Sequence, residues 1–167
     1  MIIKLEYITF QTEIGWVGIL ASEKGLRATT LPQPSQEEAR QQLGKSVEQA
    51  AWTPDRLADL AERLKAYFSN ERVTFSDKLD LSSATPFEKQ VWHQTRLIPY
   101  GETRSYLWVA EKLGKPGAAR AVGQAMGRNP LLIIVPCHRV IASNGGLGGF
   151  GGGLEMKRRL LRLEANS

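Results

Sequence analysis

Residues 105–127, SYLWVAEKLGKPGAARAVGQAMG, contain the pattern that decides the fold of the C-terminal half of the chain. Ser105 is suited to cap a short helix over YLWVAEKL, because a serine side chain accepts a hydrogen bond from a free N–H at a helix start. That helix should end at Gly114, and a second one, AARAVGQAM, should follow Gly117 and end near Gly127. Two short helices joined by a turn with glycine and proline predict a helix-turn-helix. The pattern also fits two packed helices that bind no ligand.

The second helix of this pair has two unlike faces. At about 100° per residue, one face holds side chains that would pack inward, namely Ala118, Val122, Ala125 and Met126. The opposite face holds Arg120, Gly123, Gln124 and Gly127. Glycine destabilises a helix by up to about 1 kcal/mol relative to alanine, so this outward face is unfavourable unless something else requires it. Glycines let another backbone approach closely, and a lone arginine among them can enter a narrow groove or a base stack. The alternative is a loosely specified surface helix.

Upstream of this motif, Thr85-Pro86-Phe87-Glu88 has the form of a capping box with proline at the first helical position. We expect it to open a second domain, so that the chain divides into residues 1–83 and 84–167. The second domain should be mainly α-helical and should contain the helix-turn-helix.

The first domain is predicted to be a small α/β scaffold. Residues 5–31 are rich in Ile, Val, Thr and aromatics and are broken at EIG and EKG, which predicts an antiparallel meander. A helix should then begin with Thr53 as N-cap and Pro54 in its first turn, with an apolar stripe at Leu57, Leu60, Ala61, Leu64 and Phe68. Together the two domains give a mixed α+β fold.

The single cysteine of the chain lies in LLIIVPCHRV, residues 131–140. LLIIV reads as a buried strand that Pro136 ends, because proline removes a ladder donor. Adjacent strand residues face opposite ways, so Cys137 and His138 can cooperate only if the chain turns after Pro136. An imidazole can then take the thiol proton, directly or through a water, and leave a nucleophilic thiolate. The alternative is a buried structural cysteine.

A catalytic histidine also needs a group that fixes its tautomer, and the last helix offers one. In LEMKRRLLRLE, residues 154–164, the inward stripe is Met156, Leu160 and Leu163, and Glu164 borders it. A lone carboxylate at the edge of a core is unfavourable unless it has a partner. Glu164 is therefore the candidate partner of His138, and the alternative is an exposed glutamate near the terminus.

Composition limits the class of protein. At 42% hydrophobic residues the chain can build a core, and one cysteine with two histidines is too few for a disulfide or a structural zinc site. We therefore expect no metal and no cofactor. The first residues lack a secretory pattern and no apolar run is long enough to span a membrane, which predicts the cytoplasm.

Residues 84–167 carry 12 Lys and Arg against 5 Asp and Glu, whereas residues 1–83 carry 10 against 12. A basic half is typical of a nucleic-acid binder, although a solvated surface gives the same count.

Four segments together resemble the O6-alkylguanine-DNA alkyltransferase family: PYGETRSY, GAARAVGQAMGRNP, VPCHRVI and GGFGGGLEMKRRLL, in this order. The resemblance covers about residues 84–165. It implies direct-reversal DNA repair by a monomer that binds duplex DNA through the minor groove and flips the damaged base into a pocket. The alkyl group would pass irreversibly from O6 of guanine, or from O4 of thymine, to Cys137.

The resemblance also implies roles for individual residues. Cys137 would be the acceptor, His138 its water-mediated base and Glu164 the residue that orients His138. Tyr106 would donate a hydrogen bond to the guanine, and Arg120 would fill the gap left by the flipped base. The remaining substrate- or DNA-binding positions that it implies are Ala119, Asn129, Arg139, Val140, Phe150, Gly151 and Gly152.

This chain departs from the family pattern in the glycine loop GGLGGFGGG, residues 145–153, which we expect to be mobile. Phe150 stands where many relatives have Tyr, and Gly151 where some have Ser.

Two other functions remain open on the residues alone. A Cys-His hydrolase of small esters or amides would need repeated turnover and an oxyanion hole. A redox-sensing helix-turn-helix regulator would need sequence-specific contacts, for which the outward helix face offers only Arg120 and Gln124.

Overall fold

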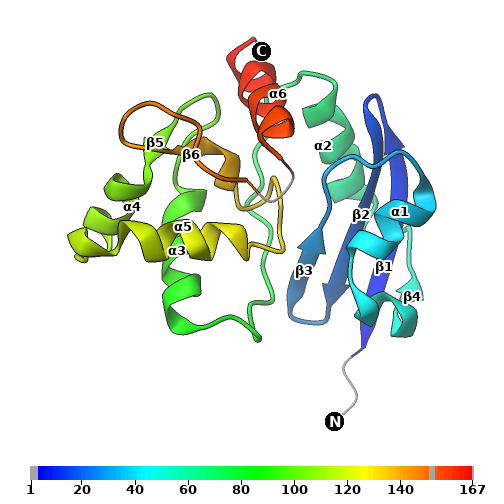
Figure 1. Ribbon diagram of the computed structural model, residues 1–167. Coiled ribbons are helices and arrows are strands. Elements are labelled where there is room, and N and C mark those ends of the chain that lie inside the picture. The colour runs from blue at the N-terminus through cyan, green and yellow to red at the C-terminus, as the bar shows by residue number, and fades with distance from the viewer. Residues whose placement is uncertain (1–3, 151–152, 167) are drawn as a thin grey trace. The chain divides into compact units, whose positions relative to one another are not determined.

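The computed structural model describes residues 4–150 and 153–166, and the chain forms two compact units (Figure 1). The first unit contains Met1–Leu81 together with Pro130–Ile134. The second contains Ser82–Asn129 and Val135–Ser167. The chain thus leaves the second unit after Asn129 and returns to it at Val135, two residues before the cysteine.

The first unit is built on the predicted antiparallel meander. β1 (Leu5–Thr12), β2 (Gly15–Ser22) and β3 (Gly25–Thr29) pair antiparallel, and a two-residue strand, β4 (Ala51–Trp52), adds to β1 in parallel. The turns lie at EIG and EKG as expected. Gly25 has φ +143° and lies so close to the backbone that a Cβ there would be 2.5 Å from the carbonyl oxygen of Lys78, so glycine is required.

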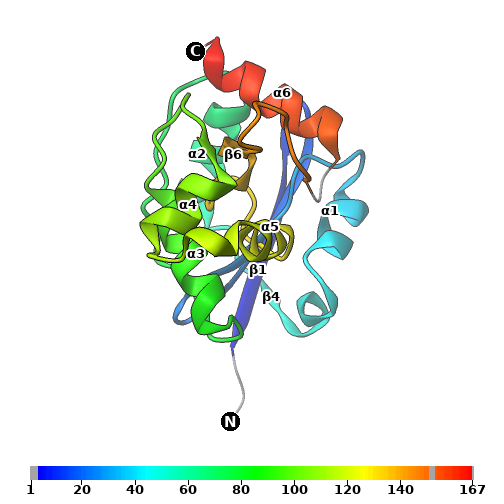
Figure 2. The same ribbon diagram turned by 60° about the vertical axis from the view of Figure 1, so that its left-hand side comes forward.

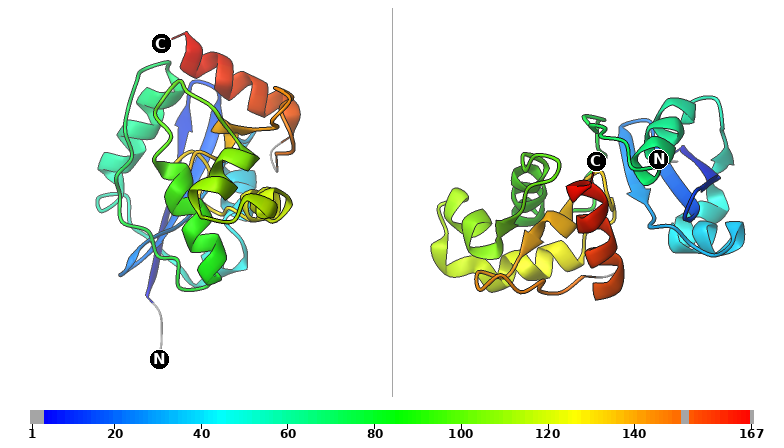
Figure 3. Two further views of the ribbon diagram at one scale, coloured as in Figure 1. Left: turned by 90° about the vertical axis from the view of Figure 1, so that its left-hand side faces the viewer. Right: turned by 90° about the horizontal axis from the view of Figure 1, so that it is seen from above.

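Two helices cover opposite faces of this sheet (Figure 3). α1 (Gln36–Gln42) and the 3₁₀ helix η1 (Lys45–Gln49) face the side on which Leu5 and Leu20 form a cluster with Leu43 and Val47. α2 (Ala58–Phe68) packs against β1. The predicted start of this helix was wrong: its N-cap is Leu57, and the N–H of Thr53 instead donates to the carbonyl of Tyr7 as the chain leaves β4. The predicted apolar stripe from Leu57 to Phe68 is buried.

The expectation that LLIIV forms a strand was also wrong. Leu131 makes one isolated β-bridge to Thr29. The N–H of Thr29 donates to the carbonyl of Pro130, and the hydroxyl of Thr29 donates to the carbonyl of Leu132. The chain then turns at Ile133, which has φ +74°. The apolar side chains at 131, 133, 134 and 135 are nevertheless buried. Hydrophobicity correctly indicated burial, but a short apolar run does not distinguish a strand from a buried turn.

The second unit contains the predicted helix-turn-helix (Figure 2). α3 (Pro86–Arg96) begins with the expected capping box, in which the Thr85 side chain accepts from the N–H of Glu88 and the Glu88 carboxylate accepts from the N–H of Thr85. α4 (Tyr106–Lys112) is capped by Ser105 and is followed by a 3₁₀ turn, η2 (Pro116–Ala118), and by α5 (Ala119–Gly127). α3 packs against both α4 and α5.

The remaining elements of this unit surround the cysteine. β5 (Arg104–Ser105) pairs in parallel with β6 (Val140–Ile141), and the one-turn 3₁₀ helix η3 (Cys137–Arg139) leads into β6. α6 (Leu154–Ala165) packs against η3. Within the ranges that the structure describes, no helix is long and apolar enough to cross a membrane.

Candidate active site around Cys137

Cys137 lies at the start of η3, in a turn that Pro136 makes possible. The N–H of Cys137 donates to the carbonyl of Val135 at 2.7 Å, and that of Arg139 donates to the carbonyl of Pro136 at 2.9 Å. Cys137 is 4% exposed and lines a pocket of about 410 Å³. The chain therefore turns after Pro136, as cooperation between neighbouring residues requires.

The walls of this pocket come from three segments of the second unit. α5 contributes one long wall, Tyr106 at the start of α4 another, and Gly149 and Phe150 of the glycine loop a third. Among the residues singled out in the sequence, Cys137, Tyr106, Ala119, Arg120 and Phe150 all line it.

The outward face of α5 is the face that borders the pocket. Arg120, Gln124 and Gly127 are exposed, whereas Val122, Ala125 and Met126 are buried, as the helical periodicity predicted. A Cβ at Gly127 would have no neighbour within 4 Å among the described residues, and one at Gly123 would make only ordinary contacts at 3.8 Å with Tyr106. Packing inside the unit therefore does not require either glycine.

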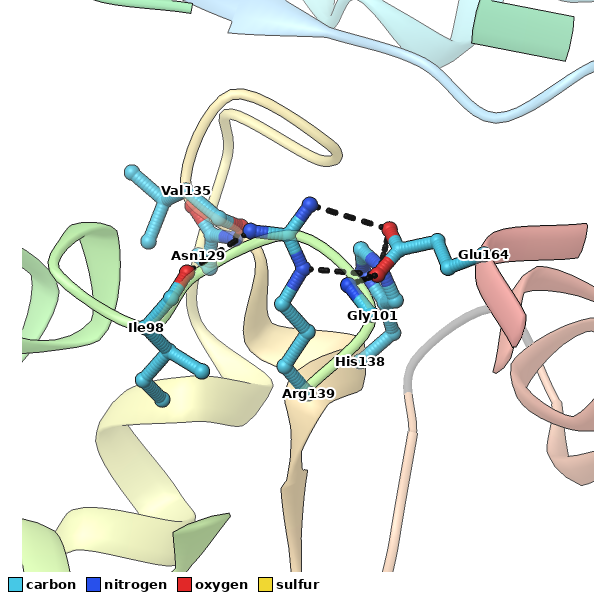
Figure 4. Close-up of polar contacts among 7 residues, drawn as sticks. All are labelled: Ile98, Gly101, Asn129, Val135, His138, Arg139 and Glu164. Carbon is cyan, nitrogen blue, oxygen red and sulfur yellow. Dashed lines mark hydrogen bonds and ion pairs between the residues drawn. The ribbon is translucent and has the colours of Figure 1, made fainter. Parts of the chain in front are cut away.

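Asn129 holds the cysteine turn. Its side-chain amide donates to the carbonyl of Val135 at 3.0 Å and to Sγ of Cys137 at 3.3 Å (Figure 4 shows Asn129 beside Val135). Burial raises the pKa of the Cys137 thiol, and the hydrogen bond from Asn129 and the positive charge of Lys157 only partly oppose this. The resting side chain is therefore a thiol, which must lose its proton when it reacts.

His138 points away from the solvent toward the last helix. Its Nε2 lies 2.6 Å from Oε2 of Glu164, and both side chains are buried (Figure 4). The same carboxylate accepts from Nε and Nη2 of Arg139 at 2.8 and 3.0 Å and from the N–H of Gly101 at 3.2 Å. The predicted pair of His138 and Glu164 is thus brought together, with a third partner that the sequence did not indicate.

The charges in this cluster follow from its burial. Burial lowers the pKa of His138, and the contact with Glu164 only partly opposes this, so the imidazole is neutral. Burial alone would raise the pKa of Glu164, but His138 and Arg139 lower it well below its ordinary value. Glu164 is therefore ionised, and Arg139 supplies the positive charge that balances it.

Arg139, which we expected among the substrate- or DNA-binding positions, has its side chain buried inside the unit. Besides its bonds to Glu164, its Nη1 donates to the carbonyl of Ile98 at 2.8 Å, and its guanidinium lies over the ring of Tyr100. Only 9% of the side chain is exposed. The sequence pattern places this segment at the end of a strand, in which side chains alternate between two faces. Cys137, His138 and Arg139 instead form the 3₁₀ helix η3, so strand alternation could not predict that Arg139 is buried.

The other expected positions are distributed as follows. Tyr106 has its hydroxyl 3.4 Å from the carbonyl of Gly149 and has a raised pKa, mainly because of burial. Val140 is buried in β6. Gly151 and Gly152 lie outside the described residues. Among the residues that are described, no group of three or more His, Cys, Asp and Glu is arranged to hold a metal ion.

Sequence reasoning missed one residue of this site, Lys157. It is fully buried, and its Nζ donates to the carbonyls of Val140 at 2.7 Å, Gly149 at 3.2 Å and Leu147. The signal was present, because Lys157 precedes Leu160 by three positions and Glu164 by seven on the inward face of α6. Lysine is so rarely buried that its place in this stripe was easy to overlook.

Comparison with protein families gives one and the same family for residues 5–81 and for residues 86–166. Residues 86–166 match the DNA binding domain of 6-O-methylguanine DNA methyltransferase, and residues 5–81 match the ribonuclease-like domain of the same protein. Together the two matches cover nearly the whole chain.

Individual relatives agree. A methylated-DNA-protein-cysteine methyltransferase of Mycolicibacterium paratuberculosis is 43% identical over 162 residues, which cover 96% of this chain and 92% of that protein. One from Methanosarcina acetivorans is 39% identical over 96% of this chain and 98% of its own length. The crystal structure of Mycobacterium tuberculosis OGT in complex with DNA superposes with a TM-score of 0.78 and 40% identity, covering 95% of this chain and 92% of that one. With both domains matched over nearly the whole chain, this chain belongs to the 6-O-methylguanine DNA methyltransferase family.

Proposed function

We propose that this methylated-DNA-protein-cysteine methyltransferase, which reverses DNA alkylation directly, accepts the alkyl group on Sγ of Cys137 from O6 of guanine. The observation that carries the proposal is the position of the only thiol of the chain. Cys137 is buried at a pocket of about 410 Å³, and α5 of the helix-turn-helix forms one wall of that pocket. O4-alkylthymine is a second substrate of the same chemical kind.

The transfer step is a displacement at the alkyl carbon. A lone pair of Sγ forms the S–C bond as the C–O6 bond breaks, and the bonding electrons go to O6 of the guanine. The thiol loses its proton, and the guanine gains one in becoming a normal base, so the reaction needs no cofactor. The thioether product has no route back to the thiol, so each molecule acts once.

His138 and Glu164 would move the thiol proton. Because Glu164 is ionised and lies 2.6 Å from Nε2, the neutral imidazole carries its proton on Nε2 and leaves Nδ1 as the basic nitrogen. We assign Nδ1 the role of accepting the thiol proton through a water, after which Glu164 stabilises the imidazolium. The raised pKa of Cys137 makes this base necessary, since the thiolate fraction at rest is small.

The pocket walls would recognise the base. Tyr106 can donate its hydroxyl hydrogen to the guanine as negative charge develops there, and the ring of Phe150 supplies an apolar wall. The carbonyl of Val140 accepts from Lys157 and has a second lone pair for the exocyclic amine of guanine. Asn129 braces the turn that carries Cys137.

α5 would bind the DNA itself through the minor groove. Its outward face is exposed, carries one arginine, and has glycines that the packing of the unit does not require. Such a face allows a DNA backbone to approach closely while Arg120 takes the place of the flipped nucleotide. Residues 84–167 would thus contain the whole chemical site, with residues 1–83 as a scaffold. We also propose that the protein acts as a monomer and that it is located in the cytoplasm.

Peptide mapping tests the proposal. The protein is incubated with a duplex oligonucleotide that contains one O6-methylguanine, digested with trypsin and analysed by mass spectrometry. We expect one methyl group on the peptide that contains Cys137, and no transfer to Cys137→Ser. Demethylation of the DNA by Cys137→Ser, or methylation of another residue, would contradict the assignment.

A further inference from the structure

Lys157 is a buried cation that the transfer mechanism above does not use. It comes from the first half of α6, is fully buried, and places its ammonium near both the Tyr106 ring, at 5.8 Å from the ring centroid, and the thiol of Cys137. A buried lysine is destabilising unless its donors are all satisfied, so its position needs a reason.

The three acceptors of Lys157 belong to two segments that are separate in the sequence. Val140 lies in β6, directly after the turn with Cys137, whereas Leu147 and Gly149 lie in the glycine loop. An ammonium has three N–H donors, and here each has a carbonyl. Lys157 therefore ties the loop to the strand that follows the catalytic turn.

The two loop carbonyls flank Gly148, and Gly148 touches Tyr106. A Cβ at Gly148 would lie 2.6 Å from the Tyr106 hydroxyl oxygen, and the residue has φ +70°. The Tyr106 hydroxyl also lies 3.4 Å from the carbonyl of Gly149. The loop backbone is thus held directly against the side chain that should contact the guanine.

We propose that Lys157 is a positioning residue that clamps residues 147–149 to β6 and so fixes the loop wall of the base pocket and the place of the Tyr106 hydroxyl. This rests on the proposed function, because the pocket is taken to receive a guanine base. Gly149 and Phe150 are the loop residues that line this pocket. A loop with this many glycines has high conformational entropy, so two hydrogen bonds from its carbonyls to one buried cation, which the third bond ties to β6, restrict it strongly.

The charge of Lys157 supports this role. Burial lowers its pKa to about 8, and the nearby Cys137 opposes the decrease, so the side chain is mainly ammonium at neutral pH. All three donors are then available to the three carbonyls. The same charge stabilises the thiolate form of Cys137, so removing it should affect both the loop and the thiol, and the two effects must be measured separately.

The test compares Lys157→Met, which keeps a long apolar stem without donors, with Arg158→Met. Arg158 is on the same helix but is 48% exposed, in a surface pair with Glu155, so this control removes the same charge without disturbing the loop. Hydrogen–deuterium exchange follows the amides of residues 143–150. Saturation kinetics with the free base O6-benzylguanine give the half-saturating concentration and the limiting rate, and iodoacetamide measures intrinsic thiol reactivity.

For Lys157→Met we expect exchange in residues 143–150 to accelerate about tenfold, and the half-saturating concentration of O6-benzylguanine to rise by about the same factor. Arg158→Met should match the unmodified protein. Unchanged exchange in the loop, or a lower limiting rate with an unchanged half-saturating concentration, would overturn the clamp and leave Lys157 acting only on the thiol.

A second variant keeps the test valid if Lys157→Met does not fold. Gly148→Ala changes an exposed loop residue and disturbs the same wall from the other side, so it should raise the half-saturating concentration while leaving iodoacetamide reactivity near that of the unmodified protein. An unchanged half-saturating concentration in Gly148→Ala would count against the loop wall. If the unmodified protein takes up no methyl group from a duplex that contains O6-methylguanine, the proposed function fails, whereas the exchange data still decide the clamp.

Discussion

Glu164→Gln should both destabilise the protein and slow alkyl transfer, because one buried carboxylate serves two purposes. In the structure it accepts four hydrogen bonds, from Nε2 of His138, from Nε and Nη2 of Arg139 and from the N–H of Gly101. Glutamine keeps the shape but replaces one oxygen with an NH₂ donor. That donor must face either the imidazole or the guanidinium, and in both cases Arg139 loses its negative partner.

The magnitude follows from the burial of the pair. Removing one partner of a buried ion pair costs about 3–5 kcal/mol, since the other charge is left uncompensated. For a chain of this size, that corresponds to a fall in Tm of about 6–20 °C. With an amide donating to Nε2, the proton of the imidazole moves to Nδ1, so the base is lost and alkyl transfer should slow by about 100-fold or more.

Differential scanning calorimetry and single-turnover transfer from a methylated duplex measure the two effects. The matched control is Glu102→Gln, which removes a carboxylate from a surface pair with Arg104 whose carboxylate is 50% exposed. An exposed pair contributes only about 0–1 kcal/mol, so its Tm should hardly change. Equal Tm values for the two variants, or an unimpaired transfer rate in Glu164→Gln, would refute the shared role of Glu164.

Three further predictions concern DNA recognition and pH. Arg120→Ala should slow repair of a duplex while sparing reaction with free O6-benzylguanine, as only the duplex requires base flipping; equal losses on both substrates would rule out that role. Gly127→Ala should raise the free energy of unfolding by about 0.5–1 kcal/mol, yet weaken binding of duplex DNA in a fluorescence anisotropy titration, because a Cβ there meets no atom of the described protein. Unchanged DNA affinity would indicate a plain surface helix. Chemical denaturation at several pH values should show stability falling as the pH drops below about 6.5, because the pKa of His138 is lowered in the folded state and the unfolded chain binds the proton first. His138→Gln should abolish that part of the slope, and a slope that persists in this variant would assign it to other groups.

The sequence predicted best what depends on local patterns. The capping box at Thr85, the Ser105 cap and the two faces of α5 follow from side chains within a few residues of one another, and the structure confirms all three. The start of α2 was placed four residues too early, because Thr53 is held by a backbone hydrogen bond to Tyr7 in a distant strand. Propensity cannot indicate such a partner.

The site shows the same limit. Proximity of His138 and Glu164 was inferred from the edge of a helical stripe, but the roles of Arg139 and Lys157 depend on where η3 and the glycine loop place their carbonyl and carboxylate partners. Both are long cationic side chains that normally face water. Only tertiary contacts show that here each satisfies a cluster of buried acceptors, and that neither is available to phosphates.

The most direct test of the account is the stoichiometry of transfer. The protein is mixed with a tenfold excess of duplex containing O6-methylguanine, and repaired DNA and intact protein mass are followed together until both are constant. Transfer to a single buried thiol predicts that repaired DNA stops at one equivalent of protein, with every protein molecule heavier by one methyl group in place of a hydrogen. Repair that continues beyond one equivalent, with the protein mass unchanged, would contradict Cys137 as the final acceptor and indicate a hydrolytic enzyme instead.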